Sequence, residues 1–290
     1  MHEPRLVASL AILTLAVVGC AGAAVTPSTV PSTTSGVVTP SAVAATSSAT
    51  TVATVASPTK PGNGLTVAFE ENCQVELIAP SGHRVLIDVY DPTQLTSPAT
   101  AADILLTTHL HTDHYNAAFE ASFPGQKITS AAGQLTVGDT KIKSIAASHD
   151  DSAIDTASAS NYMFVIEFDG FKIVHGGSTG QTELTHDQLA AIGSNVDIAA
   201  LVLENVGGHE NATNDKAIKI AEQIYPKILI PTHSAVEYLQ LIPKDWKATY
   251  SNNKTVTIPR NELPTQTTVL FMGADGPIYG NYLKLPETKW

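Results

Sequence analysis

The sequence predicts one large α/β domain over residues 64–290, and two observations indicate it. Short apolar or alternating runs, typical of strands, are interleaved with longer runs in which apolar residues recur at helical spacing. The stretch is also about 225 residues long, which fits one large domain better than two small ones.

The expected strands are short, and turn-forming residues such as Pro80, Ser81 and Gly82 separate them. In chain order they are Leu65–Phe69, Gln74–Ile78, Val85–Tyr90, Ile104–Thr107, Lys141–Ala146, Tyr162–Phe168, Phe171–Val174, Ile228–Ile230, Thr255–Ile258 and Thr267–Phe271. The expected helices are Asn116–Ser122, Thr185–Ile192, Asn214–Ile224 and Ala235–Leu241. Thr185 is a favourable N-cap residue for the second of them.

The most informative segment, residues 108–115, reads Thr-His-Leu-His-Thr-Asp-His-Tyr. It puts His109, His111, Asp113 and His114 within six residues. Imidazole and carboxylate are the ligand types that zinc and similar divalent metals prefer, and alternate spacing lets neighbouring side chains diverge toward two ions. A lone histidine is usually a surface or core residue, whereas packing does not explain such a cluster. The segment therefore predicts a metal centre.

Three downstream segments extend this pattern: Ser-His-Asp-Asp at 148–151, Asp-Gly-Phe-Lys-Ile-Val-His-Gly-Gly-Ser-Thr-Gly at 169–180, and Leu-Ile-Pro-Thr-His-Ser at 229–234. Together with the His-x-His-x-Asp-His segment, they resemble the metallo-β-lactamase superfamily over about residues 64–275. The most similar branch contains ascorbate 6-phosphate lactonase-like and related uncharacterised hydrolases. The resemblance implies an αββα sandwich, in which helices cover the outer faces of two sheets and the ligand loops gather at one edge.

The resemblance also implies two metal ions. The first would be bound by His109, His111 and His149, and the second by Asp113, His114 and His233. Zinc is the expected metal because the ligands are mostly imidazole, although iron and manganese also occupy carboxylate-containing sites. The first zinc would keep an open position for water and convert it to a nucleophilic hydroxide near neutral pH. Asp113 would orient this hydroxide or accept its proton, and the second metal would stabilise the oxyanion or the leaving group.

The chain departs from the family pattern at two places. Ser178 stands where the related hydrolases have a metal-bridging aspartate, and Glu71-Asn72-Cys73 stands where a Gly-His-Ala turn usually follows the first strand. Loss of a carboxylate between two dications predicts weaker binding of the second metal. One subclass of metallo-β-lactamases has serine at the equivalent position and still binds two zincs, so Ser178 is compatible with a two-metal site.

The expected strands also deliver the polar residues in a common way. Leu105–Thr107 ends at the His109 loop, Ser144–Ala147 at His149, Ile173–Val174 at His175 to Ser178, and Ile228–Ile230 at His233. Functional groups on loops at one edge of a rigid sheet are the usual arrangement in open α/β folds. The four strand ends are therefore expected to meet at one site.

Four further residues are expected near this site. His175 is expected to orient its loop rather than bind metal directly. His209, in a Gly-Gly-His-Glu-Asn segment, would contact substrate or replace part of the bridging function, or else be a solvated loop residue. Asp150 follows a ligand and is either a hydrogen-bond partner that fixes an imidazole tautomer or a solvated turn residue. Asp88 matches a family aspartate and is expected to support the ligand loop.

The N-terminus predicts export and lipidation. Arg5 precedes an apolar run from Leu6 to Val18 that is shorter than the roughly 20 residues of a membrane-spanning helix, which favours a cleaved signal over residues 1–20. Val17-Val18-Gly19-Cys20 resembles the lipobox of bacterial lipoproteins, so Cys20 would become the lipid-modified first residue and anchor the protein outside a bacterial membrane. The alternative is a signal peptide without lipidation. Residues 21–63, rich in Ala, Thr, Ser and Pro, are expected to form a disordered tether, with the hydrolase domain at 64–290.

Charge and cysteine content restrict the partners. Lys plus Arg total 16 and Asp plus Glu total 27, which gives a net charge of −11. An acidic protein repels phosphate backbones, so the expected partner is a small-molecule substrate and not a nucleic acid. Cys73 is the only cysteine besides Cys20, so the mature domain has no intrachain disulfide partner for it.

Three hypotheses cover these observations. The leading one is a lipid-anchored, metal-dependent hydrolase of the lactonase-like branch that acts on a small ester, lactone, amide or phosphodiester. The second is a β-lactam hydrolase that uses Ser178 in place of the bridging ligand, which the extracytoplasmic address favours. The third is a non-catalytic metal- or ligand-binding lipoprotein, for which Ser178 and Asn72 are the motivating features.

Overall fold

The computed structural model describes residues 64–70, 73–150, 154, 159–203, 216–233, 241–273, 280–281 and 284–290. These residues belong to a compact unit that spans Ala53–Trp290. The expected signal peptide with Cys20, the expected tether, Asn72 and His209 lie outside the described residues. The expected helix Ala235–Leu241 also lies outside them, except for its last residue. Among the described helices, none is both long enough and apolar enough to cross a membrane.

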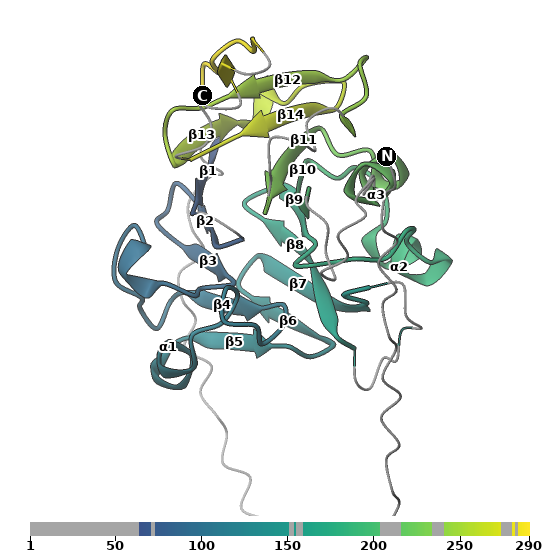
Figure 1. Cartoon of the computed structure of the whole chain (residues 1–290). Coiled ribbons are helices and arrows are strands. Elements are labelled where there is room, and N and C mark those ends of the chain that lie inside the picture. Colours follow the sequence, from purple (N-terminus) through teal and green to yellow (C-terminus); the bar gives the residue numbers. More distant parts are fainter. Residues whose placement is uncertain are drawn as a thin grey trace, which may run out of the picture. The chain divides into compact units, whose positions relative to one another are not determined.

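Two sheets form the centre of the fold (Figure 1). The first sheet has six strands in the order β13-β1-β2-β3-β4-β5. Their bounds are β1 Gly64–Phe69, β2 Val75–Ile78, β3 Arg84–Ile87, β4 Ile104–Thr107, β5 Gln126–Thr129 and β13 Thr255–Pro259. Strands β1 and β2 pair antiparallel, whereas β3, β4 and β5 run parallel.

The second sheet has eight strands in the order β12-β14-β11-β10-β9-β8-β7-β6. Their bounds are β6 Gly133–Val137, β7 Thr140–Ala147, β8 Asn161–Phe168, β9 Phe171–His175, β10 Ile198–Val202, β11 Ile228–Thr232, β12 Lys247–Tyr250 and β14 Thr268–Phe271. Strands β6 to β9 form an antiparallel meander, and β9, β10 and β11 are parallel. Because β9 to β11 are parallel, their carboxyl ends meet at one edge of the sheet.

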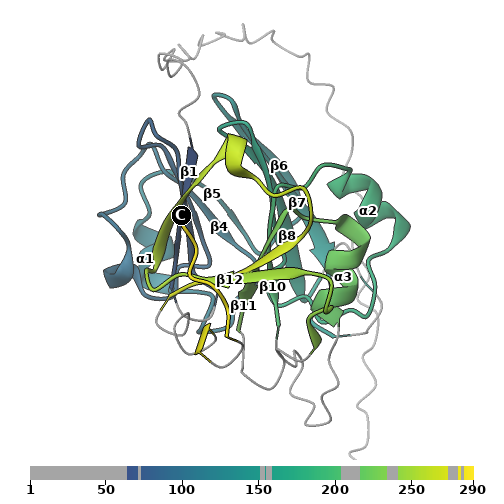
Figure 2. The ribbon, with the colours of Figure 1, turned by 90° about the horizontal axis from the view of Figure 1, so that it is seen from above.

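Three apolar clusters hold the layers together. The largest joins the facing sides of the two sheets and includes Leu106 of β4 and Phe164 of β8. A second lies between the outer face of the eight-stranded sheet and two helices, α2 (His186–Ile192) and α3 (Lys216–Ile224). The third packs α1 (Ala117–Ser122) on the six-stranded sheet through Leu105, the strand neighbour of Leu106 that points to the opposite face. Figure 2 shows α1 on one side of the sheets and α2 and α3 on the other. The fold is therefore the expected αββα sandwich.

Local sequence explains where the helices begin. Asn116 caps α1 by accepting a hydrogen bond from the Phe119 amide at 3.0 Å. Thr185 and Gln188 form a capping box at the start of α2, as the N-cap signal indicated. Two short 3₁₀ turns, Pro92–Gln94 and Arg260–Glu262, complete the regular elements with bounds in the described part of the chain.

The structure contains each expected strand and each expected helix that falls on described residues, with small changes of bounds. Strand β3 ends at Ile87 instead of Tyr90, because Asp88 has a φ of 51°, which a continuing strand does not allow. Four strands were not expected: β5, β6, β10 and β12. Of these, β10 is buried at every position, so its sequence shows no alternation of polar and apolar residues.

Candidate metal centre

The predicted ligand loops meet where the strands end. His109 follows β4, His149 follows β7, and His233 follows β11. Strands β3 and β4 are parallel neighbours, and the Asp88 amide donates to the Leu106 carbonyl at 2.9 Å, so the residues after these two strands lie side by side. The fold thus brings together residues that are more than 100 positions apart in the sequence, such as His114 and His233.

The first ligand group consists of His109, His111 and His149. One ring nitrogen of each histidine lies within 4.8 Å of the others. His109 Nε2 and His111 Nδ1 are 3.2 Å apart, and the His149 ring lies 5.1 and 5.0 Å from the His109 and His111 rings. His109 is buried, His149 is partly exposed and His111 is exposed. The group is therefore open to solvent on the His111 side.

Thr108 determines which nitrogen of His109 is available. Its hydroxyl lies 2.8 Å from Asp88 Oδ2 and 3.0 Å from His109 Nδ1. Because the hydroxyl proton goes to the carboxylate, the hydroxyl oxygen accepts the Nδ1–H of His109. His109 Nε2 then keeps its lone pair, and it is this atom that faces His111. Such outer hydrogen bonds fix the tautomers of metal-binding histidines.

The second ligand group contains Asp113, His114 and His233. The Nε2 atoms of His114 and His233 are 3.1 Å apart. Asp113 Oδ2 lies 3.8 Å from each of them, and its side chain is 46% exposed. Ser178 Oγ, at the predicted bridging position, is 2.9 Å from His114 Nε2. The structure therefore brings Ser178 into contact with this group.

Asp88 contacts residues of both ligand groups: His114 directly, and His109 through Thr108. Its carboxylate accepts the Thr108 amide at 2.7 Å, the Thr108 hydroxyl at 2.8 Å and His114 Nδ1 at 2.9 Å, and the side chain is fully buried. Burial alone raises the pKa of a carboxyl group, but the charge and hydrogen bond of His114, with His175 and the Thr108 amide, lower the pKa of Asp88 below its ordinary value. The ionised carboxylate holds the His114 proton on Nδ1 and leaves Nε2 free to bind a metal.

Cys73 is a further neighbour of the second group that sequence reasoning missed. It lies on the turn between β1 and β2, and it is fully buried. Its Sγ is 2.9 Å from His114 Nδ1, 3.4 Å from His114 Nε2 and 3.4 Å from the Asp113 carbonyl oxygen. Burial, followed by the charges of Asp88 and Asp113, raises the pKa of this thiol well above its ordinary value. The signal in the sequence was its position in the turn that departs from the family pattern.

His175 links that turn to the loop after β9. Its Nδ1 accepts the Gly177 amide at 3.2 Å, so Nε2 carries the proton and donates to the Cys73 carbonyl at 3.2 Å. Both ring nitrogens are thereby used by the backbone. Burial lowers the pKa of His175, which keeps the ring neutral. These contacts are those of a residue that positions loops, because neither ring nitrogen is left for a metal.

Glycines let the loop after β9 approach the ligands closely. Gly177 has a φ of 56°, and a Cβ there would overlap Asn161 and Thr108. At Gly180 a Cβ would overlap the carbonyl group of His149. The Asn161 side chain ties this loop in place by donating to the Gly176 carbonyl at 2.9 Å. A side chain at Gly177 would push the loop away from Thr108 and Asn161, and a side chain at Gly180 would push it away from the His149 turn.

Asp150 lies in the turn that carries His149 and faces solvent, which fits the alternative of a solvated turn residue. It is exposed, and its carboxylate accepts the Ser148 hydroxyl at 3.0 Å, so it stabilises the turn that carries His149. The Ser148 amide in turn donates to Gln181 at 3.1 Å, which connects the His149 turn to the loop after β9.

The protonation states fit a metal site. Burial, and then the charge of His114, lowers the pKa of His109 to about 3 and the pKa of His233 to about 4. Burial also lowers the pKa of His149. Near pH 7 these imidazoles are neutral and offer lone pairs, as zinc and similar ions require of their ligands. A donor set of five imidazoles and one carboxylate, in which the unused nitrogens of His109 and His114 are hydrogen bonded, therefore fits a pair of divalent metals.

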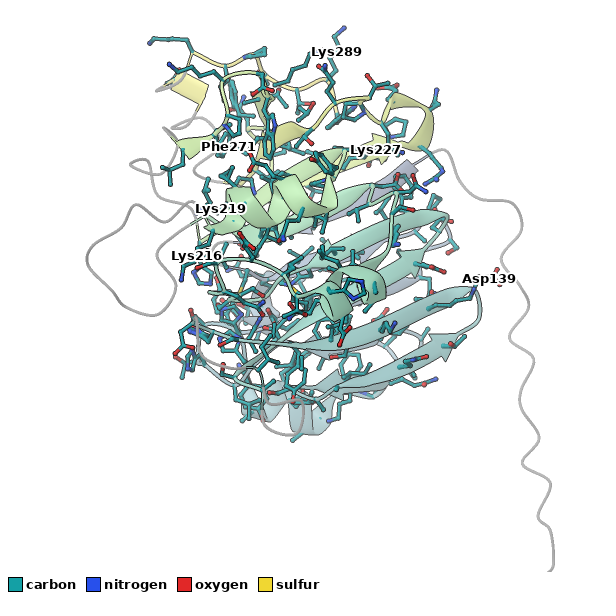
Figure 3. The ribbon with its side chains drawn as sticks, turned by 90° about the vertical axis from the view of Figure 1, so that its right-hand side faces the viewer. Asp139, Lys216, Lys219, Lys227, Phe271 and Lys289 are labelled. Carbon is teal, nitrogen blue, oxygen red and sulfur yellow. The ribbon has the colours of Figure 1, made fainter. Side chains whose placement is uncertain are left out.

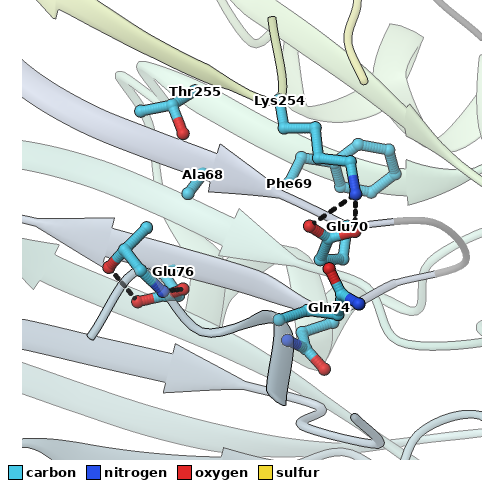
Figure 4. Close-up of a pocket in the computed structure, with 9 residues that line it drawn as sticks. Ala68, Phe69, Glu70, Gln74, Glu76, Lys254 and Thr255 are labelled. Atoms are coloured by element: carbon cyan, nitrogen blue, oxygen red, sulfur yellow. Dashed lines mark hydrogen bonds and ion pairs between the residues drawn. The ribbon is translucent and has the colours of Figure 1, made fainter. Parts of the chain in front are cut away.

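A pocket elsewhere on the domain has different chemistry. It is lined by residues around β1, β2 and β13, including Glu70, Gln74, Glu76, Lys254 and Thr255 (Figure 4). Lys254 is paired with Glu70 at 2.6 Å, and the Glu76 carboxylate accepts the Thr96 amide at 2.7 Å and the Thr96 hydroxyl at 2.8 Å. Its lining includes none of the six predicted ligands, so the metal centre remains the better candidate for chemistry.

Comparison with known proteins identifies the family of this chain. Residues 69–233 match the model of the β-lactamase superfamily domain, a range that includes every predicted ligand. The chain belongs to this superfamily. A protein of Thermococcus onnurineus, described as a UPF0173 metal-dependent hydrolase, is 30% identical to this superfamily member over 178 residues, which are 52% of the chain and 76% of the relative.

A solved structure supports the fold. It is described as a Zn-dependent hydrolase of the metallo-β-lactamase superfamily from Thermotoga maritima. The two proteins superpose with a TM-score of 0.51 and are 21% identical, over 72% of this chain and all of that one. The expected αββα sandwich and the expected class of enzyme, a metal-dependent hydrolase, are consistent with these relatives.

Proposed function

We propose that this superfamily member is a zinc hydrolase that acts on a small ester, lactone, amide or phosphodiester, as in the lactonase-like branch. The observation that carries the proposal is the convergence of two ligand groups, in each of which one histidine has its free nitrogen selected: His109 by Thr108 and His114 by Asp88. Random clustering of histidines does not explain hydrogen bonds that leave lone pairs pointing inward. The name of the Thermococcus relative supports the same class of reaction.

The residues of the two groups have distinct roles in this proposal. His109, His111 and His149 hold the first metal, and Asp113, His114 and His233 hold the second. When bound, such metals supply a hydroxide near neutral pH and polarise the bond to be broken. Asp113 combines a distance of 3.8 Å to two ligand nitrogens with a half-exposed side chain, so it orients the attacking water or accepts its proton.

The substrate approaches over the exposed His111. Leu110, between two ligands, is 56% exposed and is one of two large exposed apolar side chains among the described residues. It offers an apolar contact beside the metal centre. The net charge of −11 disfavours polyanions, so we expect a small substrate and not a nucleic acid.

The proposal extends to the cell surface. Residues 1–20 form a lipoprotein signal, Cys20 is lipidated, residues 21–63 are a tether, and the domain from residue 64 works outside a bacterial membrane. The sequence Val17-Val18-Gly19-Cys20 supports this assignment.

A β-lactam hydrolase is the second candidate. The contact between Ser178 Oγ and His114 Nε2 at 2.9 Å favours it, because a serine takes the bridging position in one subclass of those enzymes.

The test is a substrate panel of nitrocefin, aryl esters, lactones and bis(p-nitrophenyl) phosphate with the zinc-loaded full chain. His111→Ala is the matched inactive variant, and chelation followed by zinc addition is the second control. Hydrolysis of an ester, lactone or phosphodiester that requires both zinc and His111 supports the leading proposal. Hydrolysis of nitrocefin alone supports the second candidate. Tight zinc binding without turnover of any substrate contradicts both and indicates a metal- or ligand-binding lipoprotein.

A further inference from the structure

We propose that Cys73 is a ligand of the second metal and that its thiolate supplies the negative charge that Ser178 does not. The inference rests on the proposed function only in requiring a metal at His114 and His233. It does not depend on which substrate is hydrolysed.

Cys73 lies next to the predicted ligands of the second metal. Its sulfur, one nitrogen of His114 and one nitrogen of His233 all lie within 4.8 Å of one another. The thiol has a polar contact at hydrogen-bond distance with the Asp113 carbonyl, at 3.4 Å, which is a weak bond for a buried group. Its other polar contacts are with the ring nitrogens of His114, at 2.9 Å and 3.4 Å, so the buried sulfur already lies against a predicted ligand of the second metal.

The backbone of Cys73 is fixed at this place. His175 Nε2 donates to the Cys73 carbonyl at 3.2 Å, and the Gly177 amide fixes the His175 ring at 3.2 Å. Asp88 holds the proton of His114 on Nδ1, so the metal binds at Nε2, whereas Sγ lies nearer Nδ1. Coordination therefore requires Cys73 to rotate about its Cα–Cβ bond toward Nε2, and it replaces the bond to the Asp113 carbonyl.

A thiolate at Cys73 would also supply negative charge to the second ligand group. With Ser178 in the bridging position, Asp113 is the only anionic side chain in the second group. A thiolate adds one negative charge, as the missing aspartate would. The binding step is balanced: the S–H bond breaks, a sulfur–metal bond forms, and the proton leaves to solvent, so each thiolate formed releases one proton.

A sulfur ligand would also change which metal the second group selects. Thiolate is a soft ligand that favours zinc over manganese or magnesium, which prefer oxygen ligands. A second group of sulfur, two imidazoles and one carboxylate is therefore expected to select zinc more strongly than the group without sulfur.

The experiment uses cobalt(II) as a spectroscopic substitute for zinc in the full chain. The Cys20→Ser background leaves Cys73 as the one thiol, since the chain has two cysteines. Titration with cobalt should give a thiolate-to-cobalt charge-transfer band in the near ultraviolet that grows with the second equivalent. Cys73→Ser should abolish the band and weaken the second metal at least about tenfold in calorimetry, with the first metal unchanged. Ser178→Ala is the matched control, and it should keep the band.

The outcomes separate this inference from the proposed function. One outcome is that two cobalt ions bind, that no charge-transfer band forms, and that Cys73→Ser binds both ions with unchanged affinity. In that case Cys73 is not a ligand, and the hydrolase proposal stands. If no cobalt binds to the folded protein, the proposed function and this inference both fail. Because the band is read in protein that retains Cys73, the result does not depend on the folding of any Cys73 variant.

Discussion

Replacing Asp88 by asparagine removes the charge that organises both ligand groups. The asparagine oxygen can still accept the hydrogen bond from the Thr108 amide, which in the wild type goes to the Asp88 carboxylate at 2.7 Å. The new amide nitrogen, however, faces the Thr108 hydroxyl and His114 Nδ1. His114 Nδ1 must then become an acceptor, which moves its proton to Nε2. That proton occupies the lone pair that faces His233.

The expected magnitude follows from these contacts. Loss of an outer hydrogen-bond partner typically costs 10- to 100-fold in metal affinity, or about 1.4 to 2.7 kcal/mol. The second metal should lose this full amount, because Asp88 contacts His114 directly. The first metal should lose less, because Asp88 reaches His109 only through Thr108. Metal-free protein should also be destabilised by about 1 to 3 kcal/mol, since buried partners lose their acceptor.

Calorimetric titration with zinc, combined with urea unfolding of metal-free protein, measures both effects. Asp139→Asn is the matched control, because Asp139 is an exposed residue at the turn that joins β6 and β7. Figure 3 shows it far from Lys216, whose Nζ donates to the Gly180 carbonyl at 2.6 Å beside the His149 turn. Equal losses for both metals, or unchanged affinity for the second, would refute the role assigned to Asp88.

Four other predictions concern the ligands, the charge, the pH and the anchor. His149→Ala should lose the first metal and essentially all turnover, measured by elemental analysis and the substrate assay. Ser178→Asp should raise the affinity for the second metal about 10- to 100-fold in the Cys73→Ser background, and less in protein that retains Cys73, where the thiolate already supplies the charge. Calorimetry that finds the same gain in affinity in both backgrounds would contradict this role of charge. Burial lowers the pKa values of His109 and His233 in the folded protein to about 3 and about 4, so these two histidines take up protons in the unfolded chain at a higher pH than in the folded one. Metal-free protein should therefore lose stability as the pH falls from about 6.5 toward 3, and the two histidines should cause no loss of stability above pH 6.5. Urea unfolding at several pH values checks this, and constant stability would count against it. Cys20→Ser should release active protein from membranes, and wild-type protein that takes up no clickable fatty acid would disprove the anchor.

Periodicity predicted most of the fold, because strand and helix patterns in this chain are strong. The exceptions have physical causes. Strand β10 (Ile198–Val202) is apolar throughout because both faces are covered, so its five residues carry no periodic signal. The end of β3 depends on the positive φ of Asp88, which the residue type alone does not reveal.

The convergence of the candidate ligands was predictable where they are close in sequence or follow a strand. His109, His111, Asp113 and His114 form one motif, and His149 and His233 follow apolar runs. The departure of the β1–β2 turn from the family pattern marked the region of Cys73, but its contact with His114 was not predictable, because it spans 41 positions and depends on how that turn packs. The role of Thr108 was also not predictable, since its hydroxyl bonds both Asp88 and His109 only because the paired strands β3 and β4 end side by side.

The most direct test of two adjacent ligand groups is the number of zinc ions per folded chain. Elemental analysis of zinc-loaded wild type should find two ions, and His149→Ala and His233→Ala should each retain one. The two variants should also differ in which ion they lose, with His149→Ala keeping the thiolate-to-cobalt band and His233→Ala weakening it. Wild-type protein that binds no zinc, or variants that keep both ions, would contradict the assignment of this metal centre.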